Sequence, residues 1–173
     1  MDIKTFVKTV HNWPKPGVNF LDISGILASP DALDYCIRRV EHTIAHLDIT
    51  SVVAVESRGF LFASGAAANA GVPLILARKA GKLPGKCHTV TYDTEYSQDS
   101  LQMQTHAKLG PRVLIVDDLL ATGGTITAVA QLVRNHWSVD SVSAQVVINL
   151  GFLPGQAELA NHGIALDWIT KYD

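Results

Sequence analysis

An acid pair followed by a glycine-rich loop is the part of the sequence with the clearest chemistry. Residues 113–133 read VLIVDDLLATGGTITAVAQLV, and Asp117 and Asp118 end the first apolar run. Five loop residues follow: Ala121, Thr122, Gly123, Gly124 and Thr125. Glycines let the backbone approach a ligand closely, and the amides of a loop that opens a helix bind anions such as phosphate. The carboxylates repel phosphate, so they need another partner, for which vicinal sugar hydroxyls or a hydrated Mg²⁺ are suitable.

Other phosphate loops fit this run less well. A P-loop requires a lysine after its last glycine, and Gly124 is followed by threonine. The dinucleotide fingerprint GxGxxG is absent as well. The plain structural alternative is that the acids end a strand and TGGT forms a turn. We favour a phosphate site because strand, acid pair, glycine loop and helix coincide.

A local group of cations could provide the anion-binding charge. Arg78, Lys79, Lys82 and Lys86 lie in the run RKAGKLPGK, and Arg58 follows a predicted strand. The chain as a whole has a net charge of −2. A solvated basic loop is the alternative, but ligands of α/β sheets bind at the ends of strands. We therefore expect these cations to face an anionic ligand.

Alternating strands and helices must position these residues. Apolar, β-branched runs predict buried strands at residues 51–56, 72–77 and 112–118. Helices are predicted after the Ser29-Pro30 cap and over residues 59–70 and 125–136, and a strand, a short helix and a strand follow within residues 139–149, 153–160 and 164–169. This order predicts an α/β fold with a parallel sheet and helices on both faces.

Two segments depart from the alternation. The N-terminal arm PKPGVNFLDISGIL is punctuated by proline and glycine, and residues 80–108 form a long polar connection with weak strand signals at HTVTY and SLQMQ. A connection of that length is usually functional, often a lid. The uncharged run 59–77 is long enough for a membrane span, but Asn69, Gly71 and Pro73 favour a helix, a turn and a strand.

Composition indicates one cytoplasmic domain over residues 1–173. The chain is 47% hydrophobic and 17% charged, which excludes disorder. Its small negative net charge gives no global field for nucleic acid, and two cysteines are too few for a disulfide framework. We expect neither a nucleic-acid partner nor a membrane partner.

The run VLIVDDLLATGGT resembles the signature of the type I phosphoribosyltransferases. Four further segments resemble the adenine-specific branch of that family: PKPGVNFLDISGIL, VESRGFLFA, ARKAGKLPGK and YDTEYSQDSLQMQ. The resemblance implies the type I phosphoribosyltransferase fold with an N-terminal hood at about residues 12–27 and a flexible lid at about 80–108. It also implies a homodimeric pentosyltransferase of purine salvage, and Mg²⁺ is expected because a diphosphate needs a hard divalent cation. The implied reaction joins adenine to phosphoribosyl diphosphate and gives AMP and diphosphate.

The resemblance also implies roles for particular residues. Residues 121–125 would hold the 5′-phosphate, and Asp117 and Asp118 the ribose hydroxyls, with either acid contacting Mg²⁺ through water. The other assignments are grouped by ligand. The diphosphate would meet Arg58, Arg78, Lys79, Lys82 and Tyr96. The catalytic set would be Glu95, Arg58 and Lys79, with Glu95 near the purine N7. The base would meet Asn19, Phe20, Leu21 and Leu150.

Two positions depart from the family pattern. Leu21 stands where a basic residue is usual, and Asn149 where a glutamate commonly precedes Leu150. Because of these departures, hypoxanthine, guanine or xanthine is the alternative to adenine as the substrate base. A non-catalytic sensor of phosphoribosyl diphosphate is the alternative from another class, because a fold does not determine a function.

Overall fold

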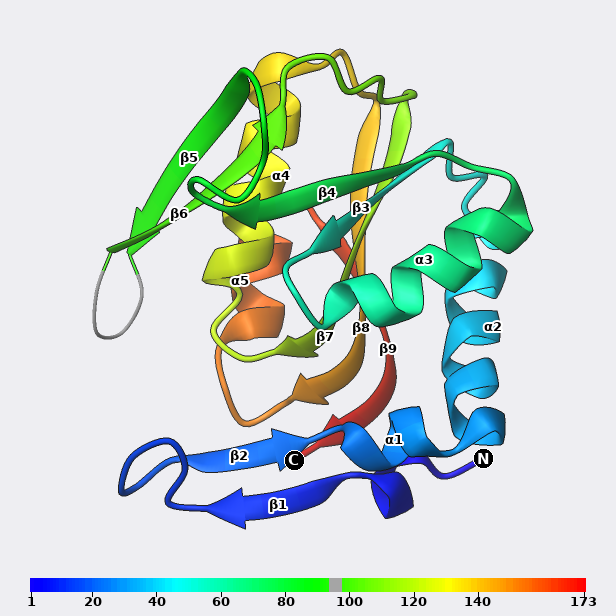
Figure 1. Ribbon diagram of the computed structural model, residues 1–173, viewed down its shortest axis with the longest axis vertical. Coiled ribbons are helices and arrows are strands. Elements are labelled where there is room, and N and C mark those ends of the chain that lie inside the picture. Colours follow the sequence, from blue (N-terminus) through cyan, green and yellow to red (C-terminus); the bar gives the residue numbers. More distant parts are fainter. Residues whose placement is uncertain (94–97) are drawn as a thin grey trace.

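The computed structural model describes residues 1–93 and 98–173 (Figure 1). Its elements in chain order are η1 (Ile3–Phe6), β1 (Lys8–His11), β2 (Asn19–Asp22), α1 (Ser24–Ala28), α2 (Pro30–His46), β3 (Ser51–Val55), α3 (Gly59–Ala70), β4 (Leu74–Lys79), β5 (Cys87–Asp93), β6 (Gln98–Gln104), β7 (Arg112–Leu120), α4 (Gly124–His136), β8 (Ser141–Leu150), α5 (Gly155–Asn161) and β9 (Ala165–Tyr172). The predicted alternation of strands and helices is confirmed.

Strands β4, β3, β7, β8 and β9 are neighbours in that order and run parallel. The polar connection after β4 extends this sheet, because β6 pairs antiparallel with β4 and β5 pairs antiparallel with β6. The sheet is therefore mixed rather than purely parallel. The weak strand signals within residues 80–108 correspond to this hairpin, whose alternating side chains bury Leu101 and Met103 against the sheet core.

Helices cover both faces of the sheet, as the alternation predicts (Figure 1). On one face, Val52 and Ala54 of β3 pack with Ala63 and Ala66 of α3. On the other face, Val53 packs in the cluster that contains most of the apolar side of α4. Because the strands are buried on both faces, they carry continuous apolar runs rather than an alternating pattern. The carboxyl ends of the parallel strands are thereby placed along one edge.

The N-terminal arm is more regular than its proline and glycine content suggests. β1 and β2 form a separate antiparallel pair with His11 opposite Asn19, so the strand pair begins before residue 12. Figure 1 shows this pair lying across the ends of β7, β8 and β9. Leu21, Ile23 and Ile26 anchor the arm in a third core cluster together with Ile148.

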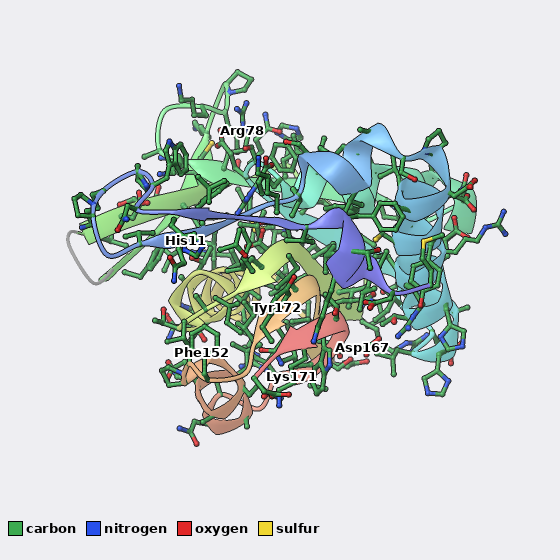
Figure 2. All side chains as sticks on the ribbon, turned by 90° about the horizontal axis from the view of Figure 1, so that it is seen from below. His11, Arg78, Phe152, Asp167, Lys171 and Tyr172 are labelled. Atoms are coloured by element: carbon green, nitrogen blue, oxygen red, sulfur yellow. The ribbon has the colours of Figure 1, made fainter. Side chains whose placement is uncertain are left out.

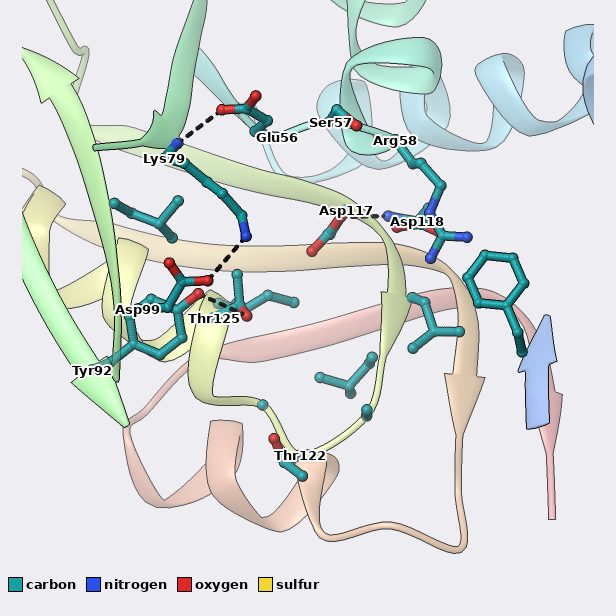
Figure 3. A pocket seen from close by; sticks show the side chains of 17 residues that line it. Glu56, Ser57, Arg58, Lys79, Tyr92, Asp99, Asp117, Asp118, Thr122 and Thr125 are labelled. Atoms are coloured by element: carbon teal, nitrogen blue, oxygen red, sulfur yellow. Dashed lines mark hydrogen bonds and ion pairs between the residues drawn. The ribbon is translucent and has the colours of Figure 1, made fainter. Parts of the chain in front are cut away.

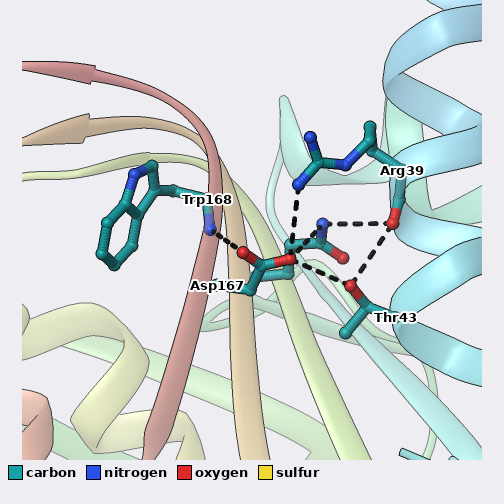
Figure 4. A network of polar contacts seen from close by, with 5 residues as sticks. Arg39, Thr43, Asp167 and Trp168 are labelled. Carbon is teal, nitrogen blue, oxygen red and sulfur yellow. Dashed lines mark hydrogen bonds and ion pairs between the residues drawn. The ribbon is translucent and has the colours of Figure 1, made fainter. Parts of the chain in front are cut away.

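A polar network fastens α2 to the far edge of the sheet (Figure 4). The Asp167 carboxylate of β9 accepts hydrogen bonds from the Thr43 hydroxyl at 3.1 Å and from the Gln145 amide at 3.4 Å. The Arg39 guanidinium lies 3.8 Å from the same carboxylate. Because Gln145 is fully buried, this network gives its amide nitrogen the partners that water cannot supply there, whereas its Oε1 has no hydrogen-bond partner within the described structure.

The uncharged run at residues 59–77 forms α3 and β4, with Gly71 in the left-handed conformation (φ 68°) between them. Within the described residues, no helix is long and apolar enough to cross a membrane. The interpretation of this run as helix, turn and strand is confirmed.

Candidate active site

A cavity of about 490 Å³ opens at the carboxyl edge of the parallel strands (Figure 3). It brings together residues from the loop after β3, from β4, β6 and β7, and from the loop before α4, which lie far apart in the sequence. Of the residues predicted for the phosphate, sugar and diphosphate, the following line it: Arg58, Lys79, Asp117, Asp118, Ala121, Thr122, Gly123 and Thr125.

The glycine loop turns directly from β7 into α4. Gly123 has φ 92°, a left-handed value that residues with a Cβ adopt at a cost. A Cβ there would also lie 2.9 Å from the Leu159 side chain and 3.1 Å from that of Glu158. The start of α4 has no side-chain cap. Its first amides are therefore available to an anion, and the helix dipole favours negative charge there.

The acid pair is buried beside this loop. Burial, and then the neighbouring charge of Asp118, raises the pKa of Asp117 well above its usual value. Burial also raises the pKa of Asp118, while the Arg58 guanidinium opposes that shift. Arg58 Nη2 lies 2.8 Å from Asp118 Oδ2. Such a pair can accept hydrogen bonds from two sugar hydroxyls when it is ionised.

A third acid, Glu56, fixes the neighbouring cations. Its two oxygens accept hydrogen bonds from Arg78 Nη2 at 3.0 Å and Nε at 3.2 Å. Its Oε2 also accepts the Lys79 amide hydrogen bond at 2.8 Å. These bonds, above all those from Arg78, lower the pKa of Glu56. The guanidinium of Arg78 is thus occupied within this chain, and neither Arg78 nor Lys82 is among the cavity-lining residues.

The hairpin β5–β6 closes the other side of the cavity. Tyr92 and Asp99, which face each other across the hairpin, both line it. The Tyr92 hydroxyl lies 3.4 Å from Thr125 Oγ1, and Asp99 Oδ2 lies 3.2 Å from Lys79 Nζ. Glu95 and Tyr96, to which the family resemblance assigns roles, lie outside the described residues.

A second, more apolar cavity of about 320 Å³ adjoins the first. All four residues predicted for the base line it: Asn19, Phe20, Leu21 and Leu150. Phe20, Arg58 and Leu119 line both cavities. The Arg58 guanidinium lies 5.0 Å above the Phe20 ring, a cation–π arrangement. One arginine therefore contacts the acid pair in the first cavity and the aromatic wall of the second.

Neither departure from the family pattern places a charge in the second cavity. The Leu21 side chain is buried, and its backbone oxygen accepts a hydrogen bond from Arg58 Nη1 at 3.4 Å. Asn149 is fully buried on β8, opposite Leu120 of β7 and Lys171 of β9.

Several lining residues were not singled out from the sequence. In the first cavity they include Glu56, Tyr92 and Asp99. In the second cavity they include Phe152 and Tyr172, which Figure 2 shows near the C-terminal strand. The strand alternation of the hairpin could have indicated Tyr92 and Asp99. No local signal identifies Phe152 or Tyr172, because long-range packing brings them to the hood.

Comparisons with known proteins agree with this geometry. Residues 23–149 match the family described as the phosphoribosyl transferase domain. The adenine phosphoribosyltransferase of Idiomarina loihiensis is 43% identical over 172 residues, covering 99% of this chain and 97% of the relative. The crystal structure of adenine phosphoribosyltransferase from Thermoanaerobacter pseudethanolicus is 37% identical, with a TM-score of 0.90 over 99% of this chain and 98% of that one. The Giardia lamblia enzyme complexed with 9-deazaadenine is 34% identical, with a TM-score of 0.92 over 99% and 97%. Since sequence and structure match over nearly the whole length, the chain belongs to the phosphoribosyltransferase family, in the group formed by the adenine phosphoribosyltransferases.

Proposed function

We propose that this chain is a purine-salvage enzyme that transfers the 5-phosphoribosyl group from phosphoribosyl diphosphate to N9 of adenine. The observation that carries this proposal is the pair of adjoining cavities. One is polar and combines an acid pair, a phosphate loop and cations, and the other is largely apolar with an aromatic wall. A sugar phosphate in the first and a flat base in the second would meet where Phe20, Arg58 and Leu119 line both cavities.

Different residues act on different parts of the substrate during this transfer. The bond between N9 and C1 forms, and the bond from C1 to the diphosphate oxygen breaks, with the electron pair leaving on diphosphate. Residues 121–125 hold the 5′-phosphate, and Asp117 and Asp118 accept hydrogen bonds from the ribose hydroxyls. Lys79 and Arg58 stabilise the charge that develops on the leaving diphosphate. Arg78 acts here through Glu56, by holding the backbone at Lys79.

A divalent cation fits the donor set. Carboxylate oxygens of Asp117 and Asp118 are hard ligands, and the described residues contain no cluster of three or more metal-ligating side chains. Mg²⁺ typically uses one or two carboxylates, waters and substrate phosphates. It would therefore bind mainly through the substrate, with either acid contacting it through water. When bound, it would neutralise charge on the diphosphate.

Other parts of the proposal rest on the family resemblance. Glu95 hydrogen-bonds the imidazole edge of the base and takes up its proton, and Tyr96 contacts the diphosphate. The segment 80–108 acts as a lid that excludes water from the reacting C1. The enzyme is a single cytoplasmic domain that works as a homodimer, in which some of the cations act across the subunit interface.

Diphosphate release from phosphoribosyl diphosphate and Mg²⁺ tests the proposal, with adenine, guanine, hypoxanthine and xanthine offered separately. We expect turnover with adenine alone and none in EDTA. Asp118→Asn should lower kcat strongly while the far-UV circular dichroism stays native. Ser143→Ala, on the same sheet and far from the acid pair in the β7–β8 register, is the control.

Each other outcome has a definite meaning. Turnover with an oxo-purine would contradict the assignment of the base cavity and leave the phosphoribosyl site in place. Binding of phosphoribosyl diphosphate without turnover on any base would favour a sensor. Near-normal kcat in Asp118→Asn would contradict the role of the acid pair.

A further inference from the structure

We propose that Asp99 is the resident counterion of Lys79, a positioning residue that competes with diphosphate for this lysine and thereby weakens diphosphate binding. The inference rests on the proposed function, in which Lys79 contacts the diphosphate. It assigns to the hairpin an electrostatic task separate from any covering of the substrates.

The geometry that supports this pairing is specific. Lys79 ends β4 and pairs with Leu101 of β6. Asp99 precedes Leu101 by two residues on the same strand, so both side chains lie on one face of the hairpin. The Asp99 carboxylate lies 3.2 Å from Lys79 Nζ, and both residues line the polar cavity. Figure 3 shows the lysine side chain extending across the cavity toward Asp99.

The other acids in the cavity already have partners that hold them. Glu56 accepts hydrogen bonds from Arg78 and from the Lys79 amide. Asp118 pairs with Arg58, and Asp117 accepts the backbone hydrogen bond of Asp118. Asp99 is thus the lining acid that the described structure pairs with the Lys79 ammonium. The Lys79 backbone is fixed by Glu56, whereas its side chain is 60% exposed and free to change partner.

Binding of diphosphate changes this pairing. The ammonium would turn to the phosphate oxygens, and the Asp99 carboxylate would remain next to a polyanion with only the Ser100 amide as its hydrogen-bond donor. The lost ion pair and the new repulsion both weaken binding. The same terms favour release of product diphosphate. Because the Lys79 side chain is 60% exposed and that of Asp99 is 32% exposed, solvent screens the ion pair, and its effect is moderate rather than decisive.

Titration calorimetry with inorganic diphosphate and Mg²⁺ tests the inference. We expect Asp99→Asn to bind diphosphate about three- to tenfold more tightly than the native chain. The KM for phosphoribosyl diphosphate should fall by a similar factor, and kcat should not rise. Asp99→Glu keeps the charge and should restore native affinity. A residue with a merely structural role would weaken binding when replaced, so the direction of change is diagnostic.

The matched control is Ser100→Ala, on the neighbouring position of β6. This change removes the hydroxyl group of Ser100, which lies 3.1 Å from Thr91 Oγ1 and hydrogen-bonds to it across the hairpin. It leaves the cavity side chains in place, and we expect native diphosphate affinity. Tighter binding in this variant would attribute the effect to the hairpin in general and overturn the counterion role.

Lys79→Met distinguishes the inferred pairing of Asp99 with Lys79 from the proposed contact between Lys79 and diphosphate. It should weaken diphosphate binding, and Asp99→Asn should then have no effect in the Lys79→Met background. Tightening that persists there would reveal a general charge effect and overturn the pairing. Unchanged or weaker binding in Asp99→Asn, with Lys79→Met weakened, would refute this inference alone. Native affinity in Lys79→Met would instead refute the proposed contact between Lys79 and diphosphate, and this inference with it.

Discussion

Gly59 is the position where one added methyl group should most directly disturb the acid pair. It is the first residue of α3, and it packs against the backbone of β7. A Cβ at this position would lie 2.6 Å from the Val116 carbonyl oxygen, 3.1 Å from Asp117 Cα and 3.4 Å from Asp117 Oδ1. Two of these three atoms are backbone atoms of a central strand, so they cannot move aside by rotating a side chain.

The expected loss of stability and activity in Gly59→Ala follows from these distances. Non-bonded heavy atoms reach their optimal separation at about 3.5–4.0 Å, so Gly59→Ala requires a shift of several tenths of an ångström between α3 and β7. Overpacking of this kind costs about 1–3 kcal/mol. At about 2–4 °C per kcal/mol for a chain of this size, the melting temperature should fall by several degrees. Because the shift moves Asp117, kcat/KM should fall by about 10- to 100-fold.

Gly65→Ala on the same helix is the matched control. Its Cβ would meet the Ile37 side chain, at 2.9 Å from Cδ1, and that methyl end can move aside. Alanine is favoured over glycine inside a helix by about 1 kcal/mol, so this variant should unfold within a few degrees of the native chain and keep its kinetics. Thermal unfolding by circular dichroism and steady-state assays on both variants test the reasoning. Equal stability and equal kcat/KM in the two variants would refute it.

Three further changes test other parts of the site. Burial and the charge of Asp118 raise the pKa of Asp117, so the folded chain loses stability as pH rises through that pKa. In EDTA, Asp117→Asn should therefore raise the melting temperature more at pH 8 than at pH 5. Equal rises at the two pH values would contradict this. Hydrogen bonds from Arg78 lower the pKa of Glu56. The Glu56 carboxylate therefore stabilises the fold above its ordinary pKa of 4.5, and this stabilisation is lost as pH falls through the lowered pKa. In urea unfolding, Glu56→Gln should lower the free energy of unfolding by about 1–2 kcal/mol at pH 7 and by less below pH 4. Phe20→Ala should raise the KM for adenine by about tenfold without an equal rise for phosphoribosyl diphosphate, and parallel rises would remove Phe20 from the base cavity.

The phosphate loop was predictable because its chemistry is local. A buried strand, two acids, a glycine turn and a helix start follow one another within residues 113–133. Their positions in space follow from backbone geometry over a few residues. The Ser29-Pro30 start of α2 was predictable for the same reason, and Ser29 does accept the hydrogen bond of the Ala32 amide.

The hood and the hairpin were predicted only in part. Proline and glycine marked the N-terminal arm as irregular, yet β1 and β2 pair with each other over residues 8–11 and 19–22. The polar stretch after β4 gave weak strand signals because one side of the hairpin stays exposed. Pairing with the edge of a sheet, which adds hydrogen bonds from outside the segment, decides such cases rather than local propensity.

The sequence by itself determined the α/β alternation, the phosphate loop and the presence of several cations. Only the tertiary structure decided which cation does what: Arg78 is held by Glu56, Arg58 spans two cavities, and Lys79 faces Asp99. The physical reason is that a charged side chain is assigned its role by its nearest opposite charge and by burial. Both depend on the register and stacking of strands that are distant in the sequence, and neither is encoded in any short segment.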